Sequence, residues 1–282
     1  MPVGWKYLVL GMALALVFTI SPALRFMGWF VGSLFHETGH VIFAWFVGCP
    51  AWPAISLRGH AAAFHQAQSG FVLAMVGLAL LLGTVLAWRH DRWKLPMVAL
   101  LVAWPLLAFV RGPREVGFLL SGHLAEMMFA GIFLWRARTG KAIEHEAERP
   151  LYACLGWFLL ARNLVLTLGL TFTASARDWY LQSGSFGLTN DYLRVATEWL
   201  HLPLEAVGAF MTLGALAVFP VVLALTWTPP APPAPRWRPP SIPHPTATTG
   251  PRAAPALANG LPALANRAPS RAVMPRVIPR SR

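Results

Sequence analysis

The chain has 282 residues, of which 56% are hydrophobic and only 12% are charged, a composition typical of a membrane protein. The net charge of +12 would suit nucleic-acid binding, but the cations lie in short loops between apolar segments and in a C-terminal tail. No compact basic domain exists, so we exclude nucleic acid as a partner. Two cysteines, Cys49 and Cys154, are too few for a disulfide framework.

Two apolar runs open the chain. The first covers residues 7–20 and is followed by Ser21-Pro22-Ala23. Because Pro22 spoils the small-residue pattern of a signal-peptide cleavage site, this run is predicted to be the first transmembrane helix. The second predicted span covers residues 26–47, and its face of small residues would let another helix pack closely against it in lipid.

The second span contains His36-Glu37-Thr38-Gly39-His40, a His-Glu-x-x-His pattern. On a helix, His36 and His40 lie one turn apart on the same face, so both imidazoles can bind one metal ion. Catalytic zinc needs a third protein ligand and one open position for water, which Glu37 can polarise before it protonates a leaving amine. Ionisable residues at membrane depth are costly unless paired or bound to metal, which favours the metal site. The alternative is a polar network between helices that holds no metal.

The next segments carry less chemistry. Residues 54–68 are too polar to form a span and are predicted to begin with a short strand. His60 and His65 follow it and are predicted to be surface or loop histidines, with a contribution to the metal site as the alternative. The third and fourth predicted spans, residues 71–88 and 95–110, contain no ionisable residue. We therefore assign both spans to scaffold.

The fifth predicted span, residues 116–135, carries His123 and Glu126 three residues apart on one helix face. His123 could be the third zinc ligand with Glu126 as its hydrogen-bond acceptor, or Glu126 could itself be the ligand. A third possibility is a structural ion pair between Glu126 and Arg162 of the sixth span, residues 151–172. We prefer His123 as the ligand, because an unliganded imidazole at mid-span would need another partner. This predicts that the fifth span packs against the second, with His123 facing the histidine pair.

The remaining inter-span segments are polar. Residues 136–150 are charged and are predicted to form a solvated loop helix. Residues 191–200 have helical periodicity and suit an interfacial helix. Asn190-Asp191 could cap that helix, or Asp191 could enter the metal site. A seventh span is predicted over residues 204–227.

After the seventh span the composition changes completely. Residues 228–282 hold 15 of the 25 prolines, eight arginines and no acidic residue, which predicts a disordered basic tail that can lie on anionic lipid. Seven spans would place the two chain ends on opposite sides, and the distribution of Lys and Arg favours a cytoplasmic tail and an outward N-terminus. The predicted fold is therefore an all-α polytopic bundle over residues 1–227 with a disordered tail over 228–282.

The metal-binding segment also carries a family resemblance. Residues 35–40 (Phe-His-Glu-Thr-Gly-His), with Ala44-Trp45 and Gly48-Cys49-Pro50 after them, resemble the active-site helix and following turn of site-2-protease-like membrane zinc metallopeptidases. The resemblance covers residues 30–60 and implies cleavage of peptide bonds at or inside the bilayer. It implies that His36 and His40 are zinc ligands and that Glu37 is the general base. Members usually supply the third ligand from an aspartate in a Leu-Asp-Gly motif, which this chain lacks. The segment most similar to that motif is Asn190-Asp191.

These observations predict an integral protein of a bacterial cytoplasmic membrane that acts as a zinc metallopeptidase. Zn²⁺ would bind His36, His40 and His123, and Glu37 would activate water against a peptide or membrane-protein substrate. Glu126, Asp191 and Arg162 are the alternative ligands or supporting residues. The competing hypothesis is a metal-binding or transport protein that uses the same His and Glu residues without catalysis.

Overall fold

The computed structural model describes residues 3–56, 60–182 and 190–227. These residues are mostly helical, as predicted, and five of their helices are long and apolar enough to cross a membrane. The number rises to six if the bent pair α1 (Val3–Ile20) and α2 (Pro22–Phe46) counts as one span. The predicted count of seven is therefore not confirmed. The predicted disordered tail lies outside the described residues.

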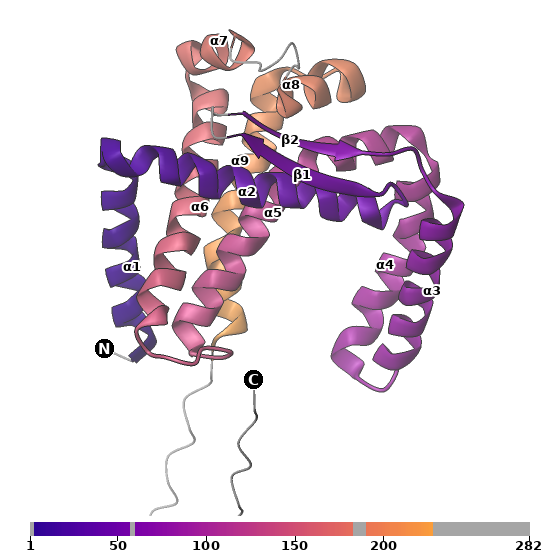
Figure 1. Cartoon of the computed structure of the whole chain (residues 1–282), viewed down its shortest axis with the longest axis horizontal. Coiled ribbons are helices and arrows are strands. Elements are labelled where there is room, and N and C mark those ends of the chain that lie inside the picture. Colours follow the sequence, from indigo (N-terminus) through magenta and orange to yellow (C-terminus); the bar gives the residue numbers. More distant parts are fainter. Residues whose placement is uncertain (1–2, 57–59, 183–189, 228–282) are drawn as a thin grey trace, which may run out of the picture. The chain divides into compact units, whose positions relative to one another are not determined.

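The chain turns by 88° between α1 and α2. Ser21 has an extended backbone because the following proline disfavours the helical conformation, and Pro22 then starts α2, where its missing N–H costs no hydrogen bond. As a result α1 runs beside α6, whereas α2 crosses the bundle (Figure 1). This bend gives α2 a direction different from that of the helices it contacts.

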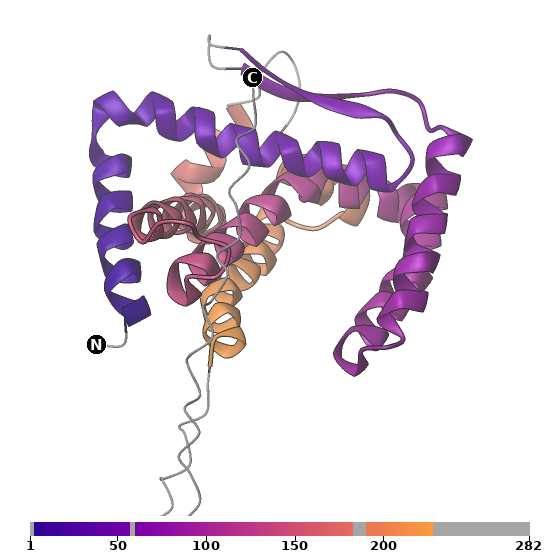
Figure 2. The same cartoon turned by 60° about the horizontal axis from the view of Figure 1, so that its bottom comes forward.

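A two-stranded antiparallel sheet follows α2 and packs against it (Figure 2). It consists of β1 (Ala51–Ser56) and β2 (His60–His65), with Ala51 opposite His65 and Ser56 opposite His60. The predicted strand corresponds to β1. The second strand was not predicted, because its run of alanines between two histidines has little β propensity. His60 and His65 accordingly lie in a strand and not in a loop.

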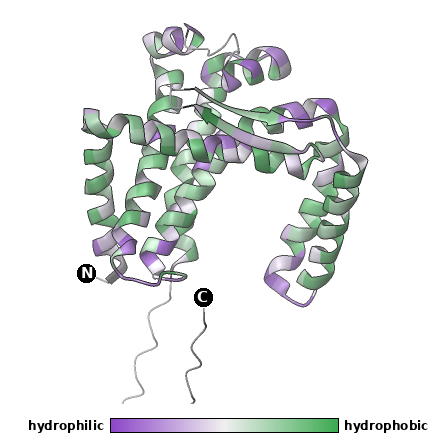
Figure 3. Cartoon of the chain, viewed as in Figure 1, coloured by the Kyte–Doolittle hydropathy of each residue, from purple (hydrophilic) through white to green (hydrophobic). Residues whose placement is uncertain are grey.

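Helices α3 (Gly70–Ala87) and α4 (Asp91–Phe109) form a hairpin. Their shared core is small and consists of Leu80, Trp104 and Ala108. Both helices are apolar over most of their length (Figure 3). The scaffold role of the third and fourth spans stays a prediction.

The main core lies among α1, α5 (Arg111–Thr139), α6 (Glu148–Phe172) and α9 (Leu204–Leu225). The predicted loop helix between α5 and α6 is wrong, because α5 continues to Thr139 and ends at Gly140 in the left-handed conformation. Buried Arg149 closes this end of α5 by donating to the backbone carbonyls of Ala137 (2.8 Å) and Arg138 (2.9 Å). The last-turn carbonyls of a helix need such donors.

The N-terminal end of α1 lies at the same end of the bundle as the α5–α6 connection. The Arg138 guanidinium sits 4.6 Å from the ring centre of Trp5, and the Tyr7 hydroxyl donates to Glu146. The tip of the α3–α4 hairpin points the same way (Figure 1). Seven spans would put the N-terminus on the side opposite the loop that follows the fifth span, and this prediction is wrong. The reason is that α1 and α2 meet at a sharp corner and count as at most one span.

A short helical segment joins α6 to α9. It contains α7 (Ala174–Gln182), α8 (Asp191–Arg194) and a π-helical turn η1 (Val195–Leu200). The predicted helix over residues 191–200 is thus present, with its second half wound as a π-helix. π-Helical turns occur often at functional sites, and α8 contacts α5 beside the histidine-bearing part of the molecule.

Candidate metal centre

The two histidines of the His-Glu-x-x-His pattern meet on one face of α2. Their Nε2 atoms are 3.1 Å apart. His40 is buried, with 6% of its surface exposed, and His36 is half-buried. The helical spacing therefore brings two imidazole nitrogens close enough to share one ion, as predicted.

Asp191 completes a triangle with this pair. Its Oδ2 lies 3.2 Å from His36 Nε2 and 3.3 Å from His40 Nε2. A tetrahedral zinc ion with bonds of about 2.0–2.1 Å separates its ligand atoms by about 3.3 Å. The three side chains thus have both the donor types and the spacing that zinc requires.

Aromatic packing brings Asp191 to this position. The Asn190 side chain donates to the carbonyl of Tyr180, and the Tyr192 backbone N–H donates to the Tyr180 hydroxyl at 3.3 Å. Tyr192 is fully buried, so the start of α8 is anchored on both sides of Asp191. Burial alone would raise the pKa of Asp191, but the imidazoles of His36 and His40 hold it below its ordinary value. The Asp191 side chain therefore favours its ionised form, faces both histidines, and has more than the capping role considered from the sequence.

The second nitrogen of each histidine faces an oxygen atom, although only that of His40 makes a hydrogen bond. His40 Nδ1 lies 2.8 Å from the carbonyl oxygen of Phe118 and 3.2 Å from Ser121 Oγ. His36 Nδ1 lies 3.3 Å from Glu126 Oε1. Histidines that bind metal usually donate their other N–H to a carbonyl or carboxylate, which fixes the ring. Here both Nδ1 atoms face such acceptors and both Nε2 atoms face the shared space.

Glu126 therefore faces His36 rather than His123, and the ion pair with Arg162 that the sequence suggested is also present. It is 1% exposed, and Asn163 of α6 donates to its Oε2. Arg162 Nη2 is more distant, at 3.8 Å from Oε1. Asn163 was not identified from the sequence as a partner of Glu126. The charged neighbour, Arg162, was the candidate instead.

Gly122 of α5 leaves room beside the histidine nitrogens. A Cβ at this position would lie 2.6 Å from both His36 Nε2 and His40 Nε2. No side chain could occupy this place without moving the imidazoles. The glycine therefore keeps open the space that the ligand atoms line.

His123 lies beside the triangle but outside it. As predicted, α5 packs against α2 and the His123 ring is next to His36, with ring centres 4.5 Å apart. One ligand atom each from His36, His123 and Asp191 lie within 4.8 Å of one another. Within the described chain, however, no nitrogen of His123 makes a hydrogen bond or ion pair with Asp191 or Glu126. The triangle with His40 is tighter, and we give it more weight as the metal-binding set.

Glu37 is buried next to this face of α2, with 7% of its surface exposed. Among the described residues its carboxylate has no hydrogen-bond or ion-pair partner. Such a carboxylate is free to interact with a bound water or substrate. Its position is compatible with the role of general base.

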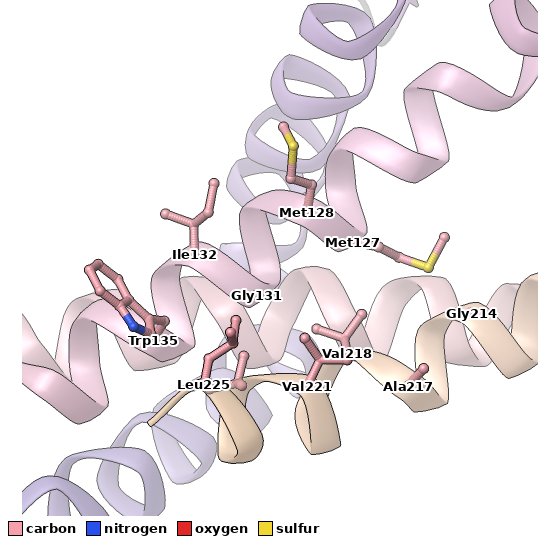
Figure 4. A pocket seen from close by; sticks show the side chains of 11 residues that line it. Met127, Met128, Gly131, Ile132, Trp135, Gly214, Ala217, Val218, Val221 and Leu225 are labelled. Atoms are coloured by element: carbon pink, nitrogen blue, oxygen red, sulfur yellow. The ribbon is translucent and has the colours of Figure 1, made fainter. Parts of the chain in front are cut away.

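Two pockets border α5. A polar one of about 270 Å³ is lined by residues including His65, Arg114 and Phe118, and His65 packs on Phe118 at 4.8 Å. An apolar one of about 430 Å³ lies between α5 and α9 and is lined by residues such as Met127 and Val218 (Figure 4). No titratable side chain lines the apolar pocket, so we do not assign chemistry to it.

Comparisons with known proteins add no assignment, because no family model, curated protein or solved structure matches the chain.

Proposed function

We propose that the chain is a membrane-embedded zinc metallopeptidase that hydrolyses peptide bonds in or near the bilayer. The observation that carries this proposal is the triangle of His36 Nε2, His40 Nε2 and Asp191 Oδ2, with sides of 3.1 to 3.3 Å. Three protein ligands with one remaining position are the arrangement of catalytic rather than structural zinc. Asp191 thus takes the place that the sequence gave to His123.

A bound zinc ion would polarise the substrate carbonyl and lower the pKa of a water molecule. Glu37 takes the proton of the attacking water and returns it to the leaving amine. Glu126 and the Phe118 carbonyl hold the two imidazoles in orientation through their Nδ1 atoms. The fixed rings and the unpaired Glu37 carboxylate support hydrolysis over simple metal storage.

The membrane location rests on the apolar helices. Five helices are capable of crossing a bilayer. We propose a bacterial cytoplasmic membrane with the α5–α6 connection and the C-terminal tail on the cytoplasmic side. The N-terminal end of α1, the tip of the α3–α4 hairpin and the α5–α6 connection point to that end (Figure 1). Their segments contain basic residues, as the positive-inside rule predicts for cytoplasmic segments: Lys6, Arg89, Arg92, Lys94, Arg136, Arg138 and Lys141. The substrate would be a membrane protein or peptide.

The decisive variant is Glu37→Gln, which removes the base without removing a ligand. Purified wild type is expected to contain about one zinc per chain and to cleave fluorescein-labelled casein or a transmembrane peptide in nanodiscs. The variant should retain zinc and lose activity by about 10²–10⁴-fold. The matched control is Glu115→Gln, a partly exposed glutamate on α5.

Transport is the competing function and has its own result. Zinc flux into proteoliposomes with no cleavage of either substrate would contradict the peptidase proposal. Cleavage that survives in Glu37→Gln would contradict the role of Glu37.

A further inference from the structure

The proposed function leaves His123 without a role. The residue is 7% exposed, and its ring stacks on Tyr192 with centres 4.1 Å apart and 22° between the planes. It meets the ring of His36 edge-on, with 75° between the planes. Since Tyr192 is fully buried and directly follows Asp191, the imidazole of His123 is held in one orientation beside the metal-binding triangle.

His123 lies farther from the atoms of the triangle than these atoms lie from one another. Its nearest ligand atom is within 4.8 Å of those of His36 and Asp191. Its Nδ1 is buried and has no hydrogen-bond partner among the described residues. Leaving a buried polar nitrogen without a partner is unfavourable, so such groups in a site call for a bound partner. A molecule held between the triangle and His123 would provide one.

Peptide hydrolysis creates a negative charge on the carbonyl oxygen of the substrate. When the water oxygen bonds to the carbonyl carbon, the C=O π electrons move to the carbonyl oxygen and Glu37 takes the water proton. The C–N bond then breaks as the amine takes that proton from Glu37. N–H donors aimed in advance at the carbonyl oxygen accelerate such reactions.

We propose that His123 is a catalytic residue that donates a hydrogen bond to the oxyanion of the substrate and is not a zinc ligand. The inference rests on the proposed peptidase function. The donated proton stays on His123 throughout, so the residue stabilises the charge without being consumed. Its stacking on Tyr192 aligns the ring before the substrate binds.

Two substitutions separate this role from the alternatives. His123→Phe keeps a flat ring on Tyr192 but removes the N–H, and His123→Gln restores an N–H donor. His90→Phe is the control, because this histidine is exposed in the turn between α3 and α4. We expect His123→Phe to keep its zinc and to lose about 10²–10³ in kcat with a smaller change in KM. His123→Gln should recover part of kcat, and the control should match wild type.

A binding measurement gives a readout that does not depend on turnover. Acetohydroxamic acid presents a carbonyl oxygen to a bound zinc ion, and its Kd for zinc-loaded His123→Phe should rise at least about tenfold, since hydrogen bonds to charged groups have this magnitude. Loss of zinc from His123→Phe would overturn the proposal in favour of a ligand role. Unchanged kcat and unchanged Kd would overturn it in favour of a packing role.

The failure of the peptidase proposal has a different signature. A wild type that binds zinc but cleaves no substrate would refute the peptidase, while the hydroxamate series would still decide whether His123 donates to a bound molecule. A wild type that binds no zinc would overturn both proposals.

Discussion

The α3–α4 hairpin and the α5–α6 pair are both apolar enough to cross a bilayer, yet the protein uses them differently. Of the most apolar stretch of each helix, 22% is buried in α3 and 6% in α4, compared with 44% in both α5 and α6. The α5–α6 pair carries buried ionisable and amide side chains, among them His123, Glu126 and Asn163, whereas the buried residues of α3 and α4 include none of these types. Polar residues within a span, rather than apolarity, therefore indicate which helices the protein packs together and where its chemistry lies.

The largest effect is expected from Gly122→Ala in the buried pair. The added methyl would lie 2.6 Å from both ligand nitrogens, so it should abolish stoichiometric zinc binding while the fold persists. Gly112→Ala on the same helix is the control, because a Cβ there would meet no atom within 4 Å. Metal analysis of the purified proteins measures the difference. Equal zinc in all three proteins would mean that the space beside Gly122 is not the metal position.

A smaller effect is expected from Glu126→Gln. The substitution keeps the shape and removes the charge that faces His36 Nδ1, and loss of such a partner typically weakens metal binding by 10–100-fold. Competition with a zinc chelator gives the affinity, and Glu115→Gln serves as the control on the same helix. An affinity within a factor of two of wild type would show that Glu126 stabilises the fold without supporting the metal centre.

The smallest effect on zinc is expected in the hairpin. Trp104 is 9% exposed, packs between α3 and α4, and donates to the Phe46 carbonyl at 2.8 Å. Trp104→Ala should cost about 3–5 kcal/mol of stability, as for other buried aromatic residues, with unchanged zinc content. Thermal unfolding in detergent and metal analysis test both parts, with exposed Trp93→Ala as the control. Loss of zinc in Trp104→Ala would show that the two regions are coupled.

The parts of the site that depend on local spacing could be predicted from the sequence. His36, Glu37 and His40 lie within one helical turn of each other, and periodicity alone fixes their common face. Helices such as α3 and α9 were found because long apolar runs leave few alternatives. The packing of α5 against α2 followed from the need of buried polar residues for partners.

The rest depended on contacts between distant segments. Asp191 appears in the sequence as a helix-start residue, and its approach to the histidines results from the packing of Tyr180 and Tyr192, 12 residues apart. No sequence pattern identified Asn163 as a partner of Glu126, because the charged neighbour Arg162 was the more obvious candidate. Pro22 indicated a break, but the 88° angle that turns α2 across the bundle is set by its neighbours.

X-ray absorption spectroscopy at the zinc edge of the zinc-loaded wild type tests the central claim most directly. Multiple scattering counts imidazole rings, and we expect two, from His36 and His40, with one carboxylate oxygen from Asp191. In Asp191→Asn the two rings should remain while affinity falls, and Asp178→Asn on exposed α7 should match wild type. Three imidazole rings in the wild-type spectrum would contradict the account, because His123 would then be the third ligand.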